Sequence, residues 1–412
     1  MSEHLIPSRR GRPGNDPIFA LNKQAAERKA AGHPVINATL GALLDDEGKL
    51  ATLASATQAI GSVKPEQWAS YAPIAGPPAF LNAVLDQLLS GFPELRKRAV
   101  AVATPGGTGA LRHAITTFVD VDDSFMTTSF YWGPYSTLAQ EHGRVVRTFS
   151  MFNEEGGFDV KALDNEIGIT FKVQQRAIII LNDPCHNPTG YSMSEQDWVA
   201  VSEVLSKRAD QGPVTVVLDI AYAAFSEGAL ARPLKALAGI SDRVMIAFCW
   251  SASKTYLEYG LRVGALVVVP PKAEDSADIE AALTFACRGT WSNCNHGGML
   301  AISQLLTDSA QRDRSDDERR VYTKLLQDRV DAWNNHATKA GLKYPRYSGG
   351  FFVTVFCDDA GAAAAALREK SVFVVPQSGA LRVALCSTAT RDVERLVREI
   401  AEAVEATNGK ES

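Results

Sequence analysis

Seven short apolar runs between residues 99 and 269 constrain the fold of this 412-residue chain more than any other feature of its sequence. The runs are too short for helices and rich in β-branched residues, and several are apolar almost throughout, as strands covered on both faces are. Stretches typical of helices, such as 109–119 and 194–210, lie between them. This alternation predicts an α/β sheet. Its strands are expected at residues 99–103, 124–129, 144–149, 176–182, 214–219, 244–250 and 263–269.

The strand signal stops after about residue 296, where a charged stretch from 297 to 340 predicts a long, solvent-facing helix with Ser315 as a candidate break. Beyond this connector the pattern predicts a smaller α+β domain, with strands at 351–356, 371–375 and 381–385 and helices at 360–370 and 390–406. The expected domain organisation is an N-terminal arm at 1–15, a small domain formed by 16–50 and 320–412, and a large domain at 51–319.

Bulk properties argue against several functions. The net charge of −5 gives no basis for binding nucleic acid or an anionic membrane. The basic N-terminus lacks the apolar stretch of a secretory signal, and no segment is long enough to span a bilayer. The six cysteines form no C-x-x-C pair and the seven histidines form no metal-ligand cluster. We therefore expect reduced thiols, a cytoplasmic location and no metal site.

Lys254 stands just past the apolar run 244–250, in the segment Ser251-Ala-Ser-Lys254. A lysine at the end of a buried strand can lose its proton and act as a nucleophile. Serines precede it and Arg262 follows eight positions later, so the segment carries the groups needed to hold a phosphate near an amine. On this segment alone, a surface lysine in a serine-rich turn is the alternative.

A glycine-rich turn, Thr104-Pro-Gly-Gly-Thr-Gly-Ala-Leu111, follows the first predicted strand and opens a helix. Glycines let the backbone close around an anion, and the N–H groups at the start of a helix attract it. The spacing does not match the dinucleotide fingerprint G-x-G-x-x-G, and no acidic residue ends the next strand. We therefore expect a phosphate-binding turn, the alternative being a tight turn without a ligand.

Two more strands are followed by candidate ligand-binding residues. Trp132 follows strand 124–129, where its ring can stack on a heterocycle, although a lone Trp is more often part of a core. Asn187 lies between two prolines in the segment 182–190, which fixes the backbone so that the amide can be aimed. Its neighbour His186 is interpreted as structural.

Asp219 ends the apolar strand 214–218, and Tyr222 follows three residues later. A carboxylate at the end of so apolar a strand needs a cationic or N–H partner. The alternative is that Asp219 caps a helix. All these constellations fall where a strand ends, which is where open α/β sheets bind ligands.

Taken together, the segments resemble class I aminotransferases of fold type I, which are pyridoxal-phosphate (PLP) enzymes, and within that class the aspartate/aromatic branch. The resemblance covers nearly the whole chain. It implies a large domain with a seven-stranded, mostly parallel sheet, a smaller α+β domain, and a homodimer with shared active sites. The matching segments are Asn15-Asp-Pro-Ile-Phe19, Gly41, Tyr71-Ala-Pro-Ile-Ala-Gly76, Pro105-Gly-Gly-Thr-Gly-Ala-Leu111, His186-Asn-Pro-Thr-Gly190, Asp219-Ile-Ala-Tyr222, Ser251 to Gly264 and Leu381-Arg-Val383.

The resemblance also implies roles for single residues. Lys254 would hold PLP as an internal aldimine and then move the proton between Cα and C4′. Asp219 would keep the pyridine nitrogen protonated, so that the ring accepts electrons. Asn187 and Tyr222 would bind the phenolic oxygen and Trp132 would stack on the ring, with Asn187 and Trp132 also facing the substrate. The phosphate would be held by Gly107, Thr108, Ser251 and Arg262, with Tyr71 reaching it from a partner subunit.

Two arginines would bind the substrate. Arg382 would grip the α-carboxylate bidentately, with the backbone of Gly41 nearby. Arg288 falls where the dicarboxylate-selective branch has an arginine donated across the dimer, although a helix-end arginine is the alternative. Two positions depart from the family pattern, because Tyr135 and Asn182 stand where histidines usually support the aspartate.

The sequence therefore predicts an aminotransferase that moves an amino group between an L-amino acid (aspartate, glutamate or aromatic) and a 2-oxo acid such as 2-oxoglutarate. A PLP-dependent lyase or decarboxylase acting on a similar amino acid would use the same residues and stays open as the alternative. A cofactor-sensing regulator would need a DNA-binding module, for which residues 1–50 leave no room.

Overall fold

The computed structural model describes residues 3–14, 17–226 and 228–408, and the chain divides into two compact units. The larger unit comprises Leu50–Gln327 and Pro345–Phe351. The smaller unit comprises Met1–Lys49, Asp328–Tyr344 and Phe352–Ser412. The domain boundaries expected from the sequence, after residues 15, 50 and 319, stay a prediction.

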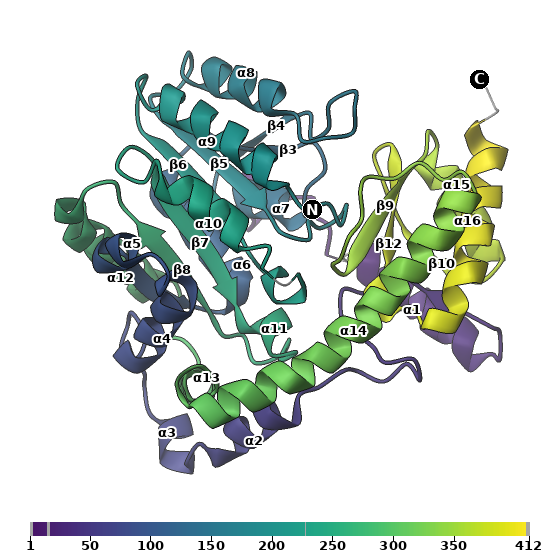
Figure 1. Cartoon of the computed structure of the whole chain (residues 1–412), viewed down its shortest axis with the longest axis horizontal. Helices are drawn as coiled ribbons and strands as arrows, with labels where there is room; N and C mark the ends of the chain where they lie inside the picture. The colour runs from purple at the N-terminus through teal and green to yellow at the C-terminus, as the bar shows by residue number, and fades with distance from the viewer. Residues whose placement is uncertain (1–2, 15–16, 227, 409–412) are drawn as a thin grey trace. The chain divides into compact units, whose positions relative to one another are not determined.

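The larger unit is built on a seven-stranded sheet in the order β2-β8-β7-β6-β5-β3-β4 (Figure 1). Strand β8 runs antiparallel to both of its neighbours, whereas the other neighbouring strands pair in parallel. The predicted α/β fold with a mostly parallel sheet is thus confirmed, and each strand lies within one residue of its expected bounds. The strands are β2 Val100–Thr104, β3 Ser124–Thr128, β4 Val145–Phe149, β5 Ala177–Asn182, β6 Val214–Asp219, β7 Met245–Ser251 and β8 Gly264–Val269.

One face of the sheet packs against α6 (Gly106–Phe118), which begins at the glycine-rich turn. Its apolar side chains Ala110, Leu111, Ala114 and Ile115 are fully buried against sheet residues such as Ile180 and Val217. Tyr135 of α7 (Pro134–Glu141) and Leu283 of α12 (Ser276–Thr290) belong to the same core cluster. Close packing therefore fixes the starts of α6 and α7 at the edge where the parallel strands end.

Helices α8, α9 and α10 lie on the other face of the sheet (Figure 1). Ser194 and Asp197 form a capping box at the start of α9, which corresponds to the helix predicted at 194–210. Within the described ranges, no helix combines the length and the apolar character that crossing a membrane requires. The remaining helices of this unit are α2 Ala54–Ser62, α3 Pro65–Ala69, α4 Pro78–Leu89, α5 Pro93–Arg98, α8 Val160–Thr170, α9 Glu195–Arg208, α10 Ala231–Ala238, α11 Ala252–Thr255 and α13 His296–Thr307.

The connector predicted at 297–340 is two helices, α13 and α14 (Ser309–Lys339), and they separate at Asp308. The candidate break at Ser315 is wrong, because α14 runs through this residue. Asp308 has an extended backbone, and its carboxylate accepts from the N–H of Gln311 at 3.0 Å, as a residue at the start of a helix does. Ser315 is instead buried within α14, where its hydroxyl donates to the Arg312 carbonyl at 2.9 Å and leaves the helix intact.

The smaller unit contains two small sheets. Strand β1 (Ile36–Asn37) pairs in parallel with β10 (Val372–Phe373), and β11 (Val375–Gln377), β12 (Ala380–Ala384) and β9 (Phe352–Phe356) form an antiparallel sheet. The strand expected at 371–375 is therefore split between two sheets. The helices of this unit are α1 Pro17–Ala30, α15 Ala360–Glu369 and α16 Val393–Asn408, and a short 3-10 turn at Thr390–Asp392 precedes α16.

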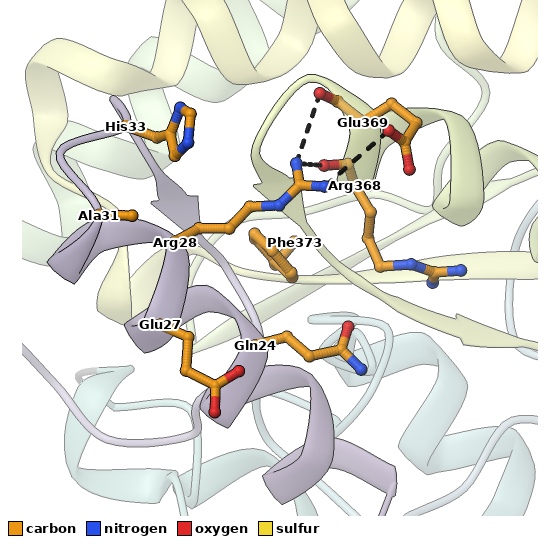
Figure 2. Close-up of a pocket in the computed structure, with 8 residues that line it drawn as sticks. All are labelled: Gln24, Glu27, Arg28, Ala31, His33, Arg368, Glu369 and Phe373. Atoms are coloured by element: carbon orange, nitrogen blue, oxygen red, sulfur yellow. Dashed lines mark hydrogen bonds and ion pairs between the residues drawn. The ribbon is translucent and has the colours of Figure 1, made fainter.

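Arg28 ties α1 to the end of α15, as Figure 2 shows. Its guanidinium donates to the backbone carbonyl oxygens of Arg368 and Glu369. The hollow beside it carries side chains of both charges, and none of the residues predicted for the active site lines it. The lining residues are Gln24, Glu27, Arg28, Ala31, His33, Arg368, Glu369 and Phe373.

Candidate active site

Asp219 is buried at the end of β6, between Asn182 at the end of β5 and Cys249 in β7. The 3-10 turn that follows has Tyr222 as its N-cap, so Asp219 does not cap a helix. The carboxyl ends of adjacent parallel strands meet at one edge of a sheet, which is why residues far apart in the sequence converge here.

Burial raises the pKa of Asp219 to about 6, and three neighbours act in the opposite direction. The phenol of Tyr135 donates to Oδ2 at 2.9 Å, and the backbone N–H of Ala221 donates to Oδ1 at 3.3 Å. The Lys254 amine attracts the carboxylate electrostatically. Asp219 is therefore mainly anionic at neutral pH and can pair with a cationic group.

A chain of hydrogen bonds links Asp219 to Asn187 and Tyr222. The amide of Asn182 donates to the backbone oxygen of Asp219 at 2.7 Å and accepts from the N–H of Asn187 at 2.6 Å. The Asn187 amide then donates to Tyr222 Oη at 3.2 Å, and its buried Oδ1 has no hydrogen-bond partner among the described residues. A buried amide without a partner at one end is costly, and a polar ligand at this point would satisfy it.

The surroundings of His186, next to Asn187, favour a structural role over a catalytic one. Its Nδ1 lies 2.8 Å from the hydroxyl of Thr189, and the side chain is buried. Burial lowers its pKa to about 3, so the imidazole is neutral at neutral pH. The structural interpretation of this histidine therefore agrees with its surroundings.

Lys254 lies in α11, the short helix that follows β7, and three aromatic rings surround its amine. The Nζ atom is 4.3 Å from the ring centroid of Tyr259, 5.7 Å from that of Phe351 and 5.9 Å from that of Tyr222. Tyr259 and Phe351 were not predicted from the sequence. Tyr259 lies within the motif itself, five residues after the lysine, whereas Phe351 comes from a distant segment that no local pattern connects to Lys254.

The glycine-rich turn and the start of β8 are in close contact. A Cβ on Gly106 would lie 2.3 Å from the guanidinium of Arg262, and one on Gly264 would lie 2.5 Å from the carbonyl carbon of Gly106. Arg262 donates to Ser253 Oγ at 3.1 Å and to the Pro105 carbonyl at 3.3 Å. Only glycine allows this approach, and the result is a cationic group beside the start of a helix, which suits an anion.

Other predicted phosphate ligands surround the same turn. Gly107 faces Ser251, since a Cβ on this glycine would lie 3.4 Å from that of the serine. Ser251 caps α11 by accepting from the N–H of Ser253 at 3.1 Å. Thr108 is exposed in the first turn of α6.

Trp132 is partly buried against the core of the larger unit. Its ring meets that of Tyr135 edge to face, with centroids 5.8 Å apart and planes at 89°. Tyr135 also donates a hydrogen bond to Asp219. The same tyrosine therefore contacts Trp132, predicted to stack on a flat ligand, and Asp219, predicted to bind the ring nitrogen of that ligand.

In the smaller unit, Arg382 and Gly41 lie beside the same ring. The guanidinium of Arg382 lies 4.6 Å from the centroid of Phe352 and donates to the Thr39 carbonyl at 2.7 Å. A Cβ on Gly41 would lie 2.9 Å from Cζ of Phe352. Arg382 is buried, so a carboxylate that reached it would meet a guanidinium held in place.

Tyr71 and Arg288 lie on the surface of the larger unit. Tyr71 is 89% exposed, and Arg288 is exposed with its guanidinium donating to Ser292 Oγ at 2.5 Å. Arg288 borders an open hollow that also contains Ile74 and Phe285, and Phe285 is 82% exposed. Neither residue is buried in the manner of Asp219 and Asn187.

The larger unit fits PLP by the chemistry of its donors. The anionic Asp219 suits the ring nitrogen, and the Oδ1–Nδ2 amide of Asn187 beside Tyr222 suits a phenolic oxygen. The amine of Lys254 suits the aldehyde. The contact between Gly106 and Arg262 at the start of α6 suits the phosphate.

Comparisons with known proteins agree with this geometry. The family model for aminotransferases of class I and II matches residues 33–400. The aromatic-amino-acid aminotransferase of Pseudomonas aeruginosa is 31% identical over 219 residues, which are 52% of this chain and 53% of that protein. The mitochondrial aspartate aminotransferase of Dictyostelium discoideum is 28% identical over 304 residues, which are 71% of this chain and 68% of that protein.

Solved structures show the same fold. An aminotransferase from Anaerococcus prevotii superimposes with a TM-score of 0.92 at 30% identity, over 98% of this chain and all of that one. An aromatic-amino-acid aminotransferase from Burkholderia pseudomallei, whose structure is described as covalently bound to pyridoxal phosphate, has a TM-score of 0.80 at 22% identity, over 97% of this chain and all of that one. With a family model that spans most of its length, the chain belongs to the class I and II aminotransferases, a family of PLP-dependent transaminases.

Proposed function

We propose that this protein moves an amino group between an L-amino acid and a 2-oxo acid, with PLP bound covalently to Lys254. The observation that carries the proposal is the convergence of three groups at one edge of the sheet. These groups are the Lys254 amine among aromatic rings, the buried Asp219 carboxylate, and the Asn187–Tyr222 pair, whose amide oxygen has no hydrogen-bond partner in the described part of the chain.

Each of these groups has a distinct task. When bound, the cofactor supplies a flat ring that withdraws electrons from the carbon next to the reacting nitrogen. Asp219 would hold a proton on the ring nitrogen. The hydroxyl of Tyr222 and the second N–H of the Asn187 amide, the one not used for Tyr222, would donate to the phenolic oxygen. Trp132 would pack on the ring. Once its amine is free, Lys254 would take the proton from the Cα atom of the substrate and return it to C4′ of the cofactor, on the other side of the reacting nitrogen.

The anion-binding turn would anchor the other end of the cofactor. The backbone N–H groups of Gly107 and Thr108 lie in the first turn of α6, where the helix dipole favours negative charge. Arg262 and Ser251 add a guanidinium and a hydroxyl. Because Tyr71 is almost fully exposed, it is available to reach the phosphate of a partner subunit in a homodimer.

We further propose that Arg382 binds the α-carboxylate of the substrate, beside the backbone of Gly41, because its planar guanidinium matches a carboxylate. Arg288, reaching the neighbouring subunit, would bind the second carboxylate of aspartate or glutamate. The exposed apolar side chains beside it, Ile74 and Phe285, support burial of this surface in a homodimer. Buried free cysteines support a cytoplasmic location.

Lys254→Ala tests the proposal most directly. Without the amine, no covalent bond to the cofactor can form, so the absorption band of the bound cofactor and all turnover should disappear. Borohydride treatment of the native protein, followed by peptide mapping, should place the reduced adduct on Lys254.

The matched control is Lys272→Ala, which removes an exposed lysine of the same unit whose nearest partner is Glu274 at 3.9 Å. This variant should keep both the band and the turnover. Retention of cofactor absorbance and activity in Lys254→Ala, or an adduct on another lysine, would refute the proposed site.

A further inference from the structure

The two oxygens of Asp219 are held differently. Oδ2 accepts a 2.9 Å hydrogen bond from the phenol of Tyr135, whereas Oδ1 accepts a longer one, at 3.3 Å, from the N–H of Ala221. The backbone of Asp219 is fixed separately by the amide of Asn182. Among the described residues, Tyr135 is thus the one whose side chain donates a hydrogen bond to the Asp219 carboxylate.

We propose that Tyr135 is a positioning residue that keeps the proton shared by Asp219 and the cofactor ring on the ring nitrogen. This inference rests on the proposed function, because it requires the ring nitrogen to face Asp219. The inference concerns a position at which this chain differs from the family, because Tyr135 replaces the usual histidine behind Asp219. The sequence alone showed that the residue differs, not what it does.

The physical reason is a competition between two arrangements of one proton. In a buried site of low dielectric, a neutral carboxylic acid beside an unprotonated nitrogen competes with an anion beside a protonated nitrogen. A hydrogen bond donated to the carboxylate stabilises only the anionic arrangement. The phenol of Tyr135 therefore makes Asp219 the weaker base of the two, and the proton stays on the ring.

Tyr135 can act as a donor at any working pH. Burial, and then the charge of Asp219, raise the pKa of its phenol well above the ordinary value, so the hydroxyl keeps its hydrogen. The neighbouring Cys249 thiol has its pKa raised by burial in the same way and adds no charge. The charged group that faces Asp219 from β7 and α11 is Lys254, which also favours the anion.

The position of the phenol is fixed by packing. Tyr135 is 1% exposed in the first turn of α7, its ring lies nearly parallel to that of Tyr131 at 11°, and the edge-to-face contact with Trp132 holds the other side. A ring held on both sides aims its hydroxyl without further loss of side-chain entropy.

The test is the protonation state of the ring nitrogen, read from the ¹⁵N chemical shift of holoenzyme loaded with ¹⁵N-labelled PLP. The native protein should show a protonated nitrogen, and Tyr135→Phe should shift the signal toward the unprotonated value. Loss of a hydrogen bond to a charged group changes an equilibrium constant by about tenfold or more, so kcat should fall by about tenfold or more. KM should change much less, since Tyr135 does not touch the substrate.

Two further variants keep the outcome interpretable. Tyr131→Phe removes a phenol from the same turn that bonds to Ser136 at 2.7 Å instead of to Asp219, and it should leave the ¹⁵N shift unchanged. Tyr135→His restores an N–H donor and should recover most of the native shift, also if Tyr135→Phe proves too unstable to study.

A native ¹⁵N shift in folded Tyr135→Phe would overturn the inference. So would a Tyr135→His variant that has a native melting temperature but the ¹⁵N shift of an unprotonated ring nitrogen. A native protein whose bound cofactor has an unprotonated ring nitrogen, or no covalent link to Lys254, would instead refute the proposed function, before Tyr135 is considered.

Discussion

Asp219 and Arg288, both predicted to bind ligands, have opposite surroundings. Asp219 is buried, and its hydrogen bonds come from the same unit of the same chain. Arg288 is exposed, bonds to Ser292 and lies beside an uncovered Phe285. The contrast supports the proposal that the part of the site that tunes the cofactor is built within one chain, whereas the part that would select the substrate needs a second copy.

Of these two residues, Asp219 should show the larger effect, and Asp219→Asn keeps the shape of its side chain but removes its charge. The neutral amide cannot stabilise a protonated ring nitrogen, so kcat should fall on the order of 10³-fold, as for loss of a preorganised electrostatic group. Steady-state rates with saturating cofactor check this. Turnover within a few-fold of the native protein would show that the buried carboxylate does not act on the ring.

A second effect of the same substitution concerns stability without cofactor. Because burial raises the folded-state pKa of Asp219 to about 6, from 3.8, the folded protein binds the proton more tightly than the unfolded chain does. The stability of the cofactor-free protein should therefore fall as pH rises from about 4 to about 6 and stay level above that.

Asp219→Asn removes this penalty, so the cofactor-free variant should be more stable than the native protein at pH 8, by up to about 3 kcal/mol. The difference should shrink as pH is lowered toward 4. Urea titrations of both cofactor-free proteins at pH 8 and pH 5 check this. A difference that does not depend on pH would mean that the carboxylate is not penalised by burial. Arg288→Ala, at an exposed residue, should show no comparable gain.

The smallest effect is expected for Arg288→Ala. Loss of one charge-assisted contact should lower kcat/KM for aspartate and glutamate by about tenfold or more relative to phenylalanine and tyrosine. Rates with these four amino acids against 2-oxoglutarate measure the ratio. Equal losses on all four would remove Arg288 from the specificity site.

A mixing experiment sharpens the same point. If Arg288 serves the neighbouring subunit, hybrid dimers of Arg288→Ala and Lys254→Ala chains contain one intact site, which combines Lys254 of one chain with Arg288 of the other. Co-expression should then give more aspartate turnover than either variant alone. No gain in isolated hybrid dimers would indicate that each chain uses its own arginine.

Sequence patterns predicted the sheet well because strand length, β-branched composition and turn residues are local properties. The same patterns placed Asp219, Asn187 and Lys254 at the strand ends, where the fold then brings them together. They did not predict the break between α13 and α14, since Asp308 and Ser315 are both good helix-starting residues. In the structure the Asp308 carboxylate accepts from the N–H of Gln311, whereas the Ser315 hydroxyl donates to a backbone carbonyl within the helix.

The rest of the site depends on contacts that no local pattern encodes. Phe351 lies beside Lys254 although almost a hundred residues separate them. Tyr135 was recognised as a departure from the family, but the oxygen of Asp219 that it binds follows only from the packing of α7 against the sheet. The roles of Tyr71 and Arg288 depend on a second chain and stay predictions.

The reversed direction of β8 has a consequence for how this site can change. Ser251 and Gly264 are paired in the β7–β8 register, so twelve intervening residues carry the chain from the reactive amine back to the guanidinium at the same edge. A parallel strand would need a crossover and would start at the opposite edge. Lys254 follows Ser251 by three residues and Arg262 precedes Gly264 by two, so the pairing of Ser251 with Gly264 sets where both side chains leave the sheet. The two ends of this connection should therefore tolerate less change than the turn residues between them.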